Sequence, residues 1–344
     1  MKIAQLAPLW KTVPPKKYAG SELVVSDLEQ SLSRMGHQVT VFACGGSHTR
    51  GRLVKVIPKT MYELAGGFSW SGIMPYEFLE YAEVFKRISE FDVIHNHLGF
   101  QFLAFSPLIK QPIVSTIHSS ASPDFPYLAK AFKKNAFVSI SNAQRKITPY
   151  LNWVKTIYHG INLDDYKVLK NPKRDYLLFI GSLTPEKGAD LAVLAARKLK
   201  QKLIIAGEIR DQAFVRNKIM RYADGKQIKF VGEVGLKQKS ALYANARATL
   251  FPIRWSEAFG LVLVESLACG TPVIALNQGS VPEIIDHNKT GFVAPNFSKF
   301  LSYIPKIDQI DRNTCRLAAE KRFDRKIMAE NYSKLYEQLV NRNK

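Results

Sequence analysis

The sequence predicts an α/β protein built from two doubly wound parallel sheets. Short apolar segments of strand length alternate with longer segments of helical periodicity through both halves of the chain, the order expected when helices cover a parallel sheet. At 344 residues the chain is long enough for about two ordinary domains. Its 46% hydrophobic and 23% charged residues match the composition of a globular protein.

The first half opens with a strand, a helix and a second strand. The strand at 2–7 leads through a polar, Pro-rich loop to a helix at 21–35, which ends at Gly36 as helices commonly do. The strand at 38–43 follows. Because loops at the carboxyl edge of a parallel sheet bind ligands, Gly20 at the end of the first loop is a candidate binding residue.

Polar side chains follow three further short strands of the first half, DVIHNH, PIVSTIH and AFVSIS. A strand at 53–57 and a helix at 75–89 are predicted before them. Since the carboxyl ends of parallel strands meet at one edge of the sheet, we expect the polar side chains to gather there. They are Asn96, His97, His118 and Ser141.

The second half repeats the alternation of strands and helices. Predicted strands lie at 176–181, 202–208, 227–234 and 272–276, with another ending at Phe251, and predicted helices lie at 185–198, 211–222, 236–245 and 259–269. Helical periodicity returns from 311 to the end. We predict a first domain at 1–163, a linker at 164–175, a second domain at 176–320, and a final helix at 321–344 that packs back on the first domain.

The predicted helix at 259–269 is apolar on nearly every face, which marks it as buried, yet Glu265 lies in its middle. A buried carboxylate without a partner would destabilise the fold by several kcal/mol or shift its pKa upward. Two kinds of partner are open, the hydroxyl groups of a bound ligand or a buried salt bridge. For Glu257, just before the helix, the alternatives are a ligand contact or a solvated helix start.

The formal charge of +20 predicts attraction to anionic partners. The basic residues are dispersed, and no recognition helix, zinc finger or RNA-binding aromatic signature accompanies them, so we expect no nucleic-acid function. Two interpretations of the charge stay open: peripheral binding to an anionic membrane surface, or a contribution to solubility alone.

The cysteine pattern and the lack of long apolar runs indicate the cellular compartment of the protein. Cys44, Cys269 and Cys315 are widely spaced, which supports neither a disulfide framework nor a zinc site. The sequence shows neither the apolar core of a signal peptide nor a run of about 20 apolar residues. We therefore expect a cytoplasmic protein, with the inner face of the membrane as the place of any peripheral binding.

Motifs along the whole chain resemble the retaining glycosyltransferases of family 4. The segment EAFGLVLVE, followed by SLACGTPVIA, is similar to the E-x7-E element of that family. Other similar segments are RMGHQVTVF, DVIHNH, YHGINLDDY, GSLTPEKGADLAVLAA and the tail from Phe323 to Leu339. The resemblance implies the GT-B fold, two Rossmann-like domains facing a deep cleft. It also implies transfer of a hexosyl group from a nucleoside diphosphate sugar to an acceptor hydroxyl, with retention, in carbohydrate biosynthesis such as that of cell-envelope polysaccharides or glycolipids.

The resemblance also implies roles for the matched residues. Glu265 would accept hydrogen bonds from ribose hydroxyls, Glu257 would meet hydroxyls of the transferred sugar, and Lys187 would bind the diphosphate. His118 would line the reaction centre and complete a catalytic set with Glu257 and Lys187. The other donor-binding residues are Gly20, Gly207, Glu208, Val234, Phe259, Gly260 and Leu261, the last three opening a helix whose N–H groups suit an anion. The implied acceptor-side residues are Asn96, His97 and Arg145.

The sequence departs from the family at Ser182, where relatives have an arginine that helps to hold the diphosphate. We hypothesise that Arg254 or Arg145 compensates. No acidic DxD-type motif is evident in the sequence, so we expect no metal or other cofactor. The motifs leave two alternatives open, a GT-B epimerase or phosphorylase and a non-catalytic subunit that binds sugar nucleotides.

Overall fold

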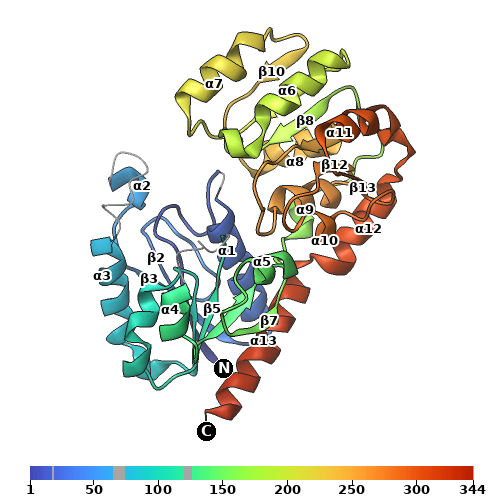
Figure 1. The fold of residues 1–344 in the computed structure, drawn as a ribbon. Coiled ribbons are helices and arrows are strands. Elements are labelled where there is room, and N and C mark those ends of the chain that lie inside the picture. The colour runs from blue at the N-terminus through green and yellow to red at the C-terminus, as the bar shows by residue number, and fades with distance from the viewer. Residues whose placement is uncertain (18, 65–73, 120–125, 344) are drawn as a thin grey trace. The chain divides into compact units, whose positions relative to one another are not determined.

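The computed structural model describes residues 1–17, 19–64, 74–119 and 126–343. The chain forms two compact units, Met1–Gly160 with Arg325–Lys344, and Ile161–Asp324 (Figure 1). It leaves the first unit after Gly160 and returns to it at Arg325. Within the described ranges, no helix is long and apolar enough to span a membrane.

The first unit is built on seven parallel strands in the order β3-β2-β1-β4-β5-β6-β7. Because the order reverses between β1 and β4, the sheet is doubly wound. The edge strand β7 was not predicted, since its sequence WVKT has no apolar run and is only partly buried. The strands are β1 (Lys2–Leu6), β2 (Gln38–Ala43), β3 (Arg52–Lys55), β4 (Val93–Asn96), β5 (Ile113–Thr116), β6 (Ala136–Ser139) and β7 (Trp153–Thr156).

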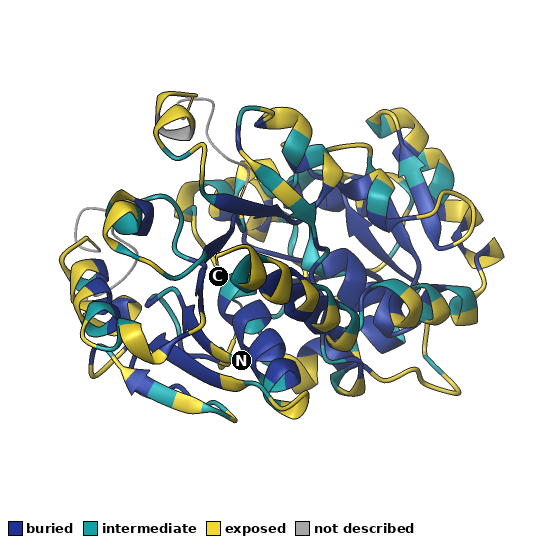
Figure 2. Ribbon diagram, turned by 90° about the horizontal axis from the view of Figure 1, so that it is seen from below, coloured by how far each residue is buried: buried dark blue, intermediate teal, exposed yellow. Residues whose placement is uncertain are grey.

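Helices that cover the sheets are buried on one side and exposed on the other, as the burial colours of Figure 2 show. The last helix lies against α1 in this unit (Figure 1). Arg325 on the last helix and Asp27 on α1 form a buried ion pair of 3.0 Å. The α-helices are α1 (Gly20–Arg34), α2 (Met61–Leu64), α3 (Met74–Phe85), α4 (Pro126–Ala131), α5 (Asn142–Ile147) and α13 (Arg325–Arg342). Short 3-10 helices lie at Ile88–Glu90 and Gln101–Leu108.

The second unit contains six parallel strands in the order β10-β9-β8-β11-β12-β13, again doubly wound. The strands are β8 (Leu177–Ile180), β9 (Leu203–Ala206), β10 (Ile228–Phe230), β11 (Ala248–Phe251), β12 (Val273–Leu276) and β13 (Gly291–Ala294). The helices are α6 (Ala189–Lys198), α7 (Gln212–Lys218), α8 (Leu236–Asn245), α9 (Leu261–Ala268), α10 (Val281–Ile284), α11 (Phe297–Tyr303) and α12 (Arg312–Arg322). The predicted alternation in this half omitted its last strand, β13, and α11 after it.

The predicted linker at 164–175 is part of the second unit, which is a correction to the predicted domain boundaries. Leu163–Asp165 forms a 3-10 helix, and Tyr166 is buried with its hydroxyl donating to Glu265 at 2.9 Å. The segment lacks helical or strand periodicity because it packs against the second unit through single side chains and not through one regular face. Its irregular sequence therefore indicated a linker where the structure has an anchored segment.

The helix predicted at 185–198 is divided by Gly188. Residues Pro185–Lys187 form a separate 3-10 turn, and α6 begins only at Ala189. Gly188 has a left-handed backbone with φ 77°, and a Cβ atom there would lie 2.1 Å from the carbonyl oxygen of Pro252. Lys187 is thus placed on a tight turn beside the end of β11 rather than on a regular helix.

Helix α3 exposes large apolar side chains and buries two carboxylates. Met74, Phe78 and Leu79 are 51%, 49% and 52% exposed, whereas Glu77 and Glu80 are buried on the opposite face. The Tyr81 hydroxyl lies 3.4 Å from Glu77 Oε2. Among the described residues, neither carboxylate oxygen of Glu80 has a hydrogen-bond partner. Tyr81 and Val84 share the buried face with the two carboxylates, so α3 carries large apolar side chains on its exposed face as well as on its buried one.

We expect Glu80→Met to stabilise the protein, and more so at high pH. Burial, followed by the neighbouring carboxylate of Glu77, raises the pKa of Glu80 well above its usual value. A raised folded-state pKa means that stability is present below the unfolded pKa of about 4.3 and is lost as pH rises through the folded pKa. Removing the group should add about 1–3 kcal/mol to the free energy of unfolding at neutral pH.

Urea denaturation at about pH 4.5 and about pH 8 measures this difference. Glu330→Met, which removes an exposed carboxylate from α13, is the matched control and should change stability little at either pH. A gain for Glu80→Met that does not grow with pH would contradict the explanation.

Candidate active site

Glu265, the carboxylate predicted to be buried, lies in the middle of α9. The loop directly before this helix is shaped by a glycine. The helix begins at Leu261, two residues later than predicted, because Gly260 adopts a left-handed conformation with φ 84° and ψ 69°. A Cβ atom at Gly260 would come within 3.2 Å of the Leu263 side chain. Both the conformation and the space thus favour glycine here.

The loop before α9 is held by the turn that follows β12. The backbone N–H of Ser280 donates to the Glu257 carbonyl at 2.9 Å, and the Ser280 hydroxyl donates to the Phe259 carbonyl at 2.8 Å. Gly279 lies so close that a Cβ atom there would be 2.2 Å from the Glu257 carbonyl oxygen. The backbone N–H groups at the start of α9 are therefore fixed in position before any anion binds.

Glu265 has three partners within the chain. Its Oε1 accepts hydrogen bonds from the Tyr166 hydroxyl at 2.9 Å and from the ammonium group of Lys239, and its Oε2 accepts one from the Tyr243 hydroxyl at 3.0 Å. Glu265 is 3% exposed and Lys239 is 9% exposed. Burial and the adjacent carboxylate raise the pKa of Tyr243 well above its usual value, which keeps this phenol a donor. Of the two alternatives for Glu265, the buried salt bridge is present in the structure.

Sequence reasoning missed Lys239 and both tyrosines as partners of Glu265. A signal for Lys239 was available, because it lies on the same helical stripe as Tyr243, four residues apart, and that stripe of α8 is buried. A lysine on an inward stripe requires a buried counter-charge. No comparable pattern marks Tyr166, which lies in the irregular segment before β8.

Lys187 and Glu257, two of the three predicted catalytic residues, form an ion pair of 2.6 Å. The indole N–H of Trp255 also donates to Glu257 Oε2 at 3.2 Å, and the Lys187 ammonium lies 4.8 Å from the centre of the Trp255 ring. Both donors meet the same oxygen, so Glu257 Oε1 has no hydrogen-bond partner among the residues that the structure describes. The pair offers a cation and an unoccupied carboxylate oxygen side by side.

The predicted donor-binding residues Gly207 and Glu208 lie at the same edge of this sheet. A Cβ atom at Gly207 would be 1.8 Å from the Gly181 carbonyl oxygen, and the Glu208 carbonyl accepts a hydrogen bond from the Leu183 N–H at 2.8 Å. The ends of β8 and β9 are therefore in backbone contact. Val234, the third predicted residue, is buried after the end of β10.

The two arginines proposed to compensate for Ser182 are both held by other groups. The Arg254 guanidinium binds both oxygens of Asp190 at 2.7 Å and the Pro185 carbonyl at 2.6 Å. The Asp190 carboxylate raises the pKa of Arg254. Arg145 lies in the first unit, where it donates to the Trp153 carbonyl and to Thr156, each at 3.3 Å. Neither geometry favours the compensation hypothesis.

The predicted residues of the first unit gather at the carboxyl edge of its sheet. His97 Nδ1 lies 2.9 Å from His118 Nε2, and His118 Nδ1 lies 3.3 Å from Nε2 of His159, a residue that the sequence did not single out. Asn96 is fully buried, and its amide nitrogen donates to the Gly99 carbonyl and to the Ser115 hydroxyl. Asn96 thus fixes the local backbone, while the histidines form a connected series.

The remaining predicted residue of the first unit is Gly20. It is the first residue of α1, with Ala19 as the preceding cap. The sequence placed Gly20 in the loop just before this helix, so its position shifts by one residue only.

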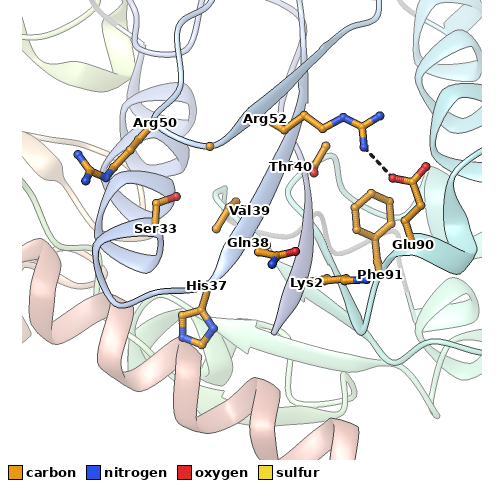
Figure 3. A pocket seen from close by; sticks show the side chains of 11 residues that line it. Lys2, Ser33, His37, Gln38, Val39, Thr40, Arg50, Arg52, Glu90 and Phe91 are labelled. Atoms are coloured by element: carbon orange, nitrogen blue, oxygen red, sulfur yellow. Dashed lines mark hydrogen bonds and ion pairs between the residues drawn. The ribbon is translucent and has the colours of Figure 1, made fainter.

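A pocket of about 530 Å³ lies at the opposite, amino-terminal edge of the first sheet. Figure 3 shows that its basic side chains do not converge: Arg52 points to Glu90, with which it forms a 2.7 Å ion pair, and Arg50 points to the other side. This pocket contains none of the predicted site residues. It therefore has no part in the candidate active site.

In the described ranges, no three or more His, Cys, Asp or Glu side chains are arranged to hold a metal ion. The three cysteines are buried and free. Burial raises the pKa of the Cys44 thiol to about 11 and those of Cys269 and Cys315 to about 12, so these side chains serve as small core residues.

Two family profiles together span most of the chain. "Glycosyltransferase Family 4" matches residues 18–165, and "Glycosyl transferases group 1" matches residues 161–321. The chain belongs to glycosyltransferase family 4. The GT-B fold class predicted from the sequence is confirmed, as is glycosyltransferase activity.

Relatives of this glycosyltransferase are distant. It is 26% identical to an uncharacterized glycosyltransferase of Methanocaldococcus jannaschii, with 85% of this chain and 84% of that protein covered. It is 24% identical to O-antigen chain mannosyltransferase C of Escherichia coli, covering 85% of each. Similar solved structures include sucrose-phosphate synthase of Thermosynechococcus elongatus (TM-score 0.81, 19% identity, 99% of each chain). Another is HepE of Anabaena in complex with UDP-glucose (TM-score 0.77, 18% identity, 98% of this chain and 100% of that one).

We expect Lys239→Met to lower the free energy of unfolding by about 3–5 kcal/mol, because it leaves the buried Glu265 carboxylate without its counter-charge. The double variant Lys239→Met with Glu265→Gln should recover most of this loss, since a neutral amide needs no cation. Urea denaturation measures both. Lys237→Met, on the exposed face of the same helix, is the control, and an equally small effect at both lysines would contradict the pairing.

Proposed function

We propose that this glycosyltransferase moves a sugar from a nucleoside diphosphate sugar to an acceptor hydroxyl, with retention at the anomeric carbon and without a metal ion. The observation that carries the proposal is the Lys187–Glu257 pair beside the fixed start of α9. A cation and a helix N-terminus suit a diphosphate, and a carboxylate oxygen suits sugar hydroxyls. HepE, whose fold is similar, was crystallised with UDP-glucose.

In this proposal, donor binding exchanges the Lys187–Glu257 ion pair for ligand contacts. Lys187 turns to the diphosphate, and Glu257 accepts hydrogen bonds from the hydroxyls of the transferred sugar. As the glycosidic bond breaks, negative charge grows on the leaving diphosphate. Lys187 and the N–H groups of Phe259, Gly260 and Leu261 would stabilise it more in the transition state than in the ground state.

Retention of the anomeric configuration would result if the acceptor hydroxyl attacks the sugar on the same face from which the diphosphate leaves. A double displacement needs a carboxylate free to attack the anomeric carbon. Glu265 is enclosed by Tyr166, Tyr243 and Lys239, which argues against that role. Glu257, by its resemblance to relatives, meets sugar hydroxyls instead. The acceptor proton would then pass to the departing phosphate oxygen.

The remaining donor contacts extend the same proposal. A carboxylate has about four acceptor positions, so Glu265 keeps capacity for a ribose hydroxyl. At 3% exposure, however, Tyr166 or Lys239 must shift to admit the ribose. Backbone groups at Gly207, Glu208 and Val234 would meet the base, and Gly20 and His118 would approach the donor sugar.

On the acceptor side, His97 and Arg145 would contact the hydroxyl substrate. The amide nitrogen of Asn96 already donates two hydrogen bonds within the protein, which favours a supporting role for this residue. The similarity to an O-antigen chain mannosyltransferase favours an acceptor from polysaccharide synthesis.

Incubation of the protein with a donor chosen by thermal-shift screening against UDP, GDP, ADP and dTDP sugars tests the proposal. We expect a product with the donor's anomeric configuration by NMR and full turnover in EDTA. Lys187→Ala should lower kcat/KM by about 10²–10³-fold, the effect of removing one charge-stabilising donor. Lys198→Ala, an exposed lysine at the end of α6, should leave kcat/KM unchanged. An inverted product or inhibition by EDTA would refute retention or metal independence, respectively.

We further propose that α3 binds an anionic membrane surface at the periphery. Its exposed residues Met74, Phe78 and Leu79 are apolar, and Glu77 and Glu80 are buried away from that face. The third acid of the helix, Glu83, is paired with Lys86 and Arg87 at 2.7 and 2.6 Å. A surface without uncompensated acid on a chain of charge +20 complements anionic lipid.

Sedimentation with lipid vesicles tests the role of α3. We expect binding to vesicles with anionic lipid but not to neutral ones, with binding weakened by salt. The double change Phe78→Ser and Leu79→Ser should weaken binding by about tenfold or more, since two buried apolar side chains are lost. Leu317→Ser on α12, equally exposed at 50%, is the control. Equal binding to both kinds of vesicle would exclude the proposal.

A further inference from the structure

Trp255 is an exposed aromatic residue that contacts both members of the Lys187–Glu257 pair. Its indole N–H donates to Glu257 Oε2 at 3.2 Å, and the centre of its ring lies 4.8 Å from the Lys187 ammonium. The residue is 41% exposed, so its ring is not part of the core. The motifs in the sequence did not identify it.

The loop that carries Trp255 is fastened to the turn that carries Lys187. The backbone N–H of Arg254 donates to the Glu186 carbonyl at 2.8 Å, and the Arg254 guanidinium donates to both oxygens of Asp190, each at 2.7 Å. Bidentate bonds of this kind fix geometry as well as distance. The indole is therefore held beside Lys187 even though its ring is exposed.

The two donors to Glu257 Oε2 differ in what donor binding does to them. The Lys187 ammonium donates at 2.6 Å and the Trp255 indole at 3.2 Å. In the proposed exchange, Lys187 turns to the diphosphate and the carboxylate loses its shorter bond. Trp255 and Glu257 lie two residues apart on one loop, between the end of β11 at Phe251 and the start of α9, so the indole N–H remains in reach.

The indole N–H therefore matters more in the bound state than in the free one. In the free protein, Lys187 holds the Glu257 carboxylate with or without the indole. In the bound state, the lysine has changed its anion, and the indole is the protein donor that keeps Oε2 in place while Oε1 meets the sugar hydroxyls. An interaction contributes to affinity only when it differs between the two states, and this one does.

We propose that Trp255 is a positioning residue for the donor sugar, whose indole N–H holds the Glu257 carboxylate after Lys187 has turned to the diphosphate. The effect on donor binding rests on the proposed function. The hydrogen bond on which the effect depends can be tested without any substrate.

NMR of the tryptophan indole N–H groups gives the substrate-free test. The Trp255 signal is identified through its loss in Trp255→Phe, and Lys187→Met imitates the departure of the lysine from Glu257. We expect the Trp255 N–H to stay hydrogen-bonded in Lys187→Met, with a downfield shift and slow exchange with water. It should lose both properties in Glu257→Ala. The Trp153 indole, which donates to the Thr148 carbonyl at 2.8 Å, is the internal control and should not change.

The comparison of the two variants decides the first part of the inference. If Lys187→Met moves the Trp255 signal to the position that it has in Glu257→Ala, the bond does not outlast the lysine, and the proposal is overturned.

Binding of a nucleotide sugar and of the matching free nucleoside diphosphate tests the effect on the donor. The pair is the one, among the UDP, GDP, ADP and dTDP compounds, that gives the largest thermal shift. Trp255→Phe keeps a ring beside Lys187 and removes the N–H. It should weaken the nucleotide sugar about tenfold, the effect of losing a hydrogen bond to a charged group, and leave the nucleoside diphosphate within about twofold. Trp153→Phe, the same change in the first unit, should leave both affinities within about twofold.

A double-variant cycle separates positioning from packing. In a Glu257→Ala background, Trp255→Phe should cause no further loss of affinity for the nucleotide sugar, because the acceptor of the N–H is gone. An equal loss for both ligands, or a loss that persists in this background, would indicate a packing role and overturn the inference. If no nucleotide sugar binds to the wild type, the proposed function fails, but the NMR result still decides whether the indole bond outlasts the lysine.

Discussion

The second unit depends on how one buried carboxylate is neutralised. Helix α9 must be apolar to pack behind its sheet, and Glu265 interrupts it. The required donors come from two directions, Lys239 and Tyr243 on α8 and Tyr166 in the segment before β8. A buried ion pair stabilises only when such additional hydrogen bonds complete it. The carboxylate therefore ties α8, α9 and the entry segment together, and that tie positions the loop of Glu257.

Close backbone contacts then set where the ends of the strands lie. Gly188 contacts the Pro252 carbonyl, Gly207 contacts the Gly181 carbonyl, and Gly279 contacts the Glu257 carbonyl, each at a distance that excludes a side chain. These contacts bring the turns after β8, β9, β11 and β12 against one another. Lys187 and Glu257 meet because these close backbone contacts hold the turns that carry them together. The length of either side chain is not the cause.

Much of this could be predicted from the sequence, because periodicity and strand ends report on backbone layout. The strand at Gln38–Ala43 and the helix at Leu236–Asn245 were predicted residue for residue. Edge strands were the main omission, since β7 and β13 are short and lack a long apolar run. The division at Gly188 was also missed, because the clash that requires glycine involves Pro252, distant in sequence. The motifs identified Glu257, Glu265, Lys187 and His118, but not their partners within the protein.

The two Lys–Glu pairs of the second unit differ in what they leave open. Glu265 accepts three hydrogen bonds, shared between its two oxygens, and is nearly inaccessible to solvent. Separating it from Lys239 would therefore leave an unpaired charge in the core. Both donors to Glu257 share Oε2, and the Lys187 and Glu257 side chains keep 19% and 12% exposure. An arriving diphosphate can replace one anion by another at Lys187 with little desolvation. The first pair is therefore suited to hold the fold, and the second to exchange with a substrate.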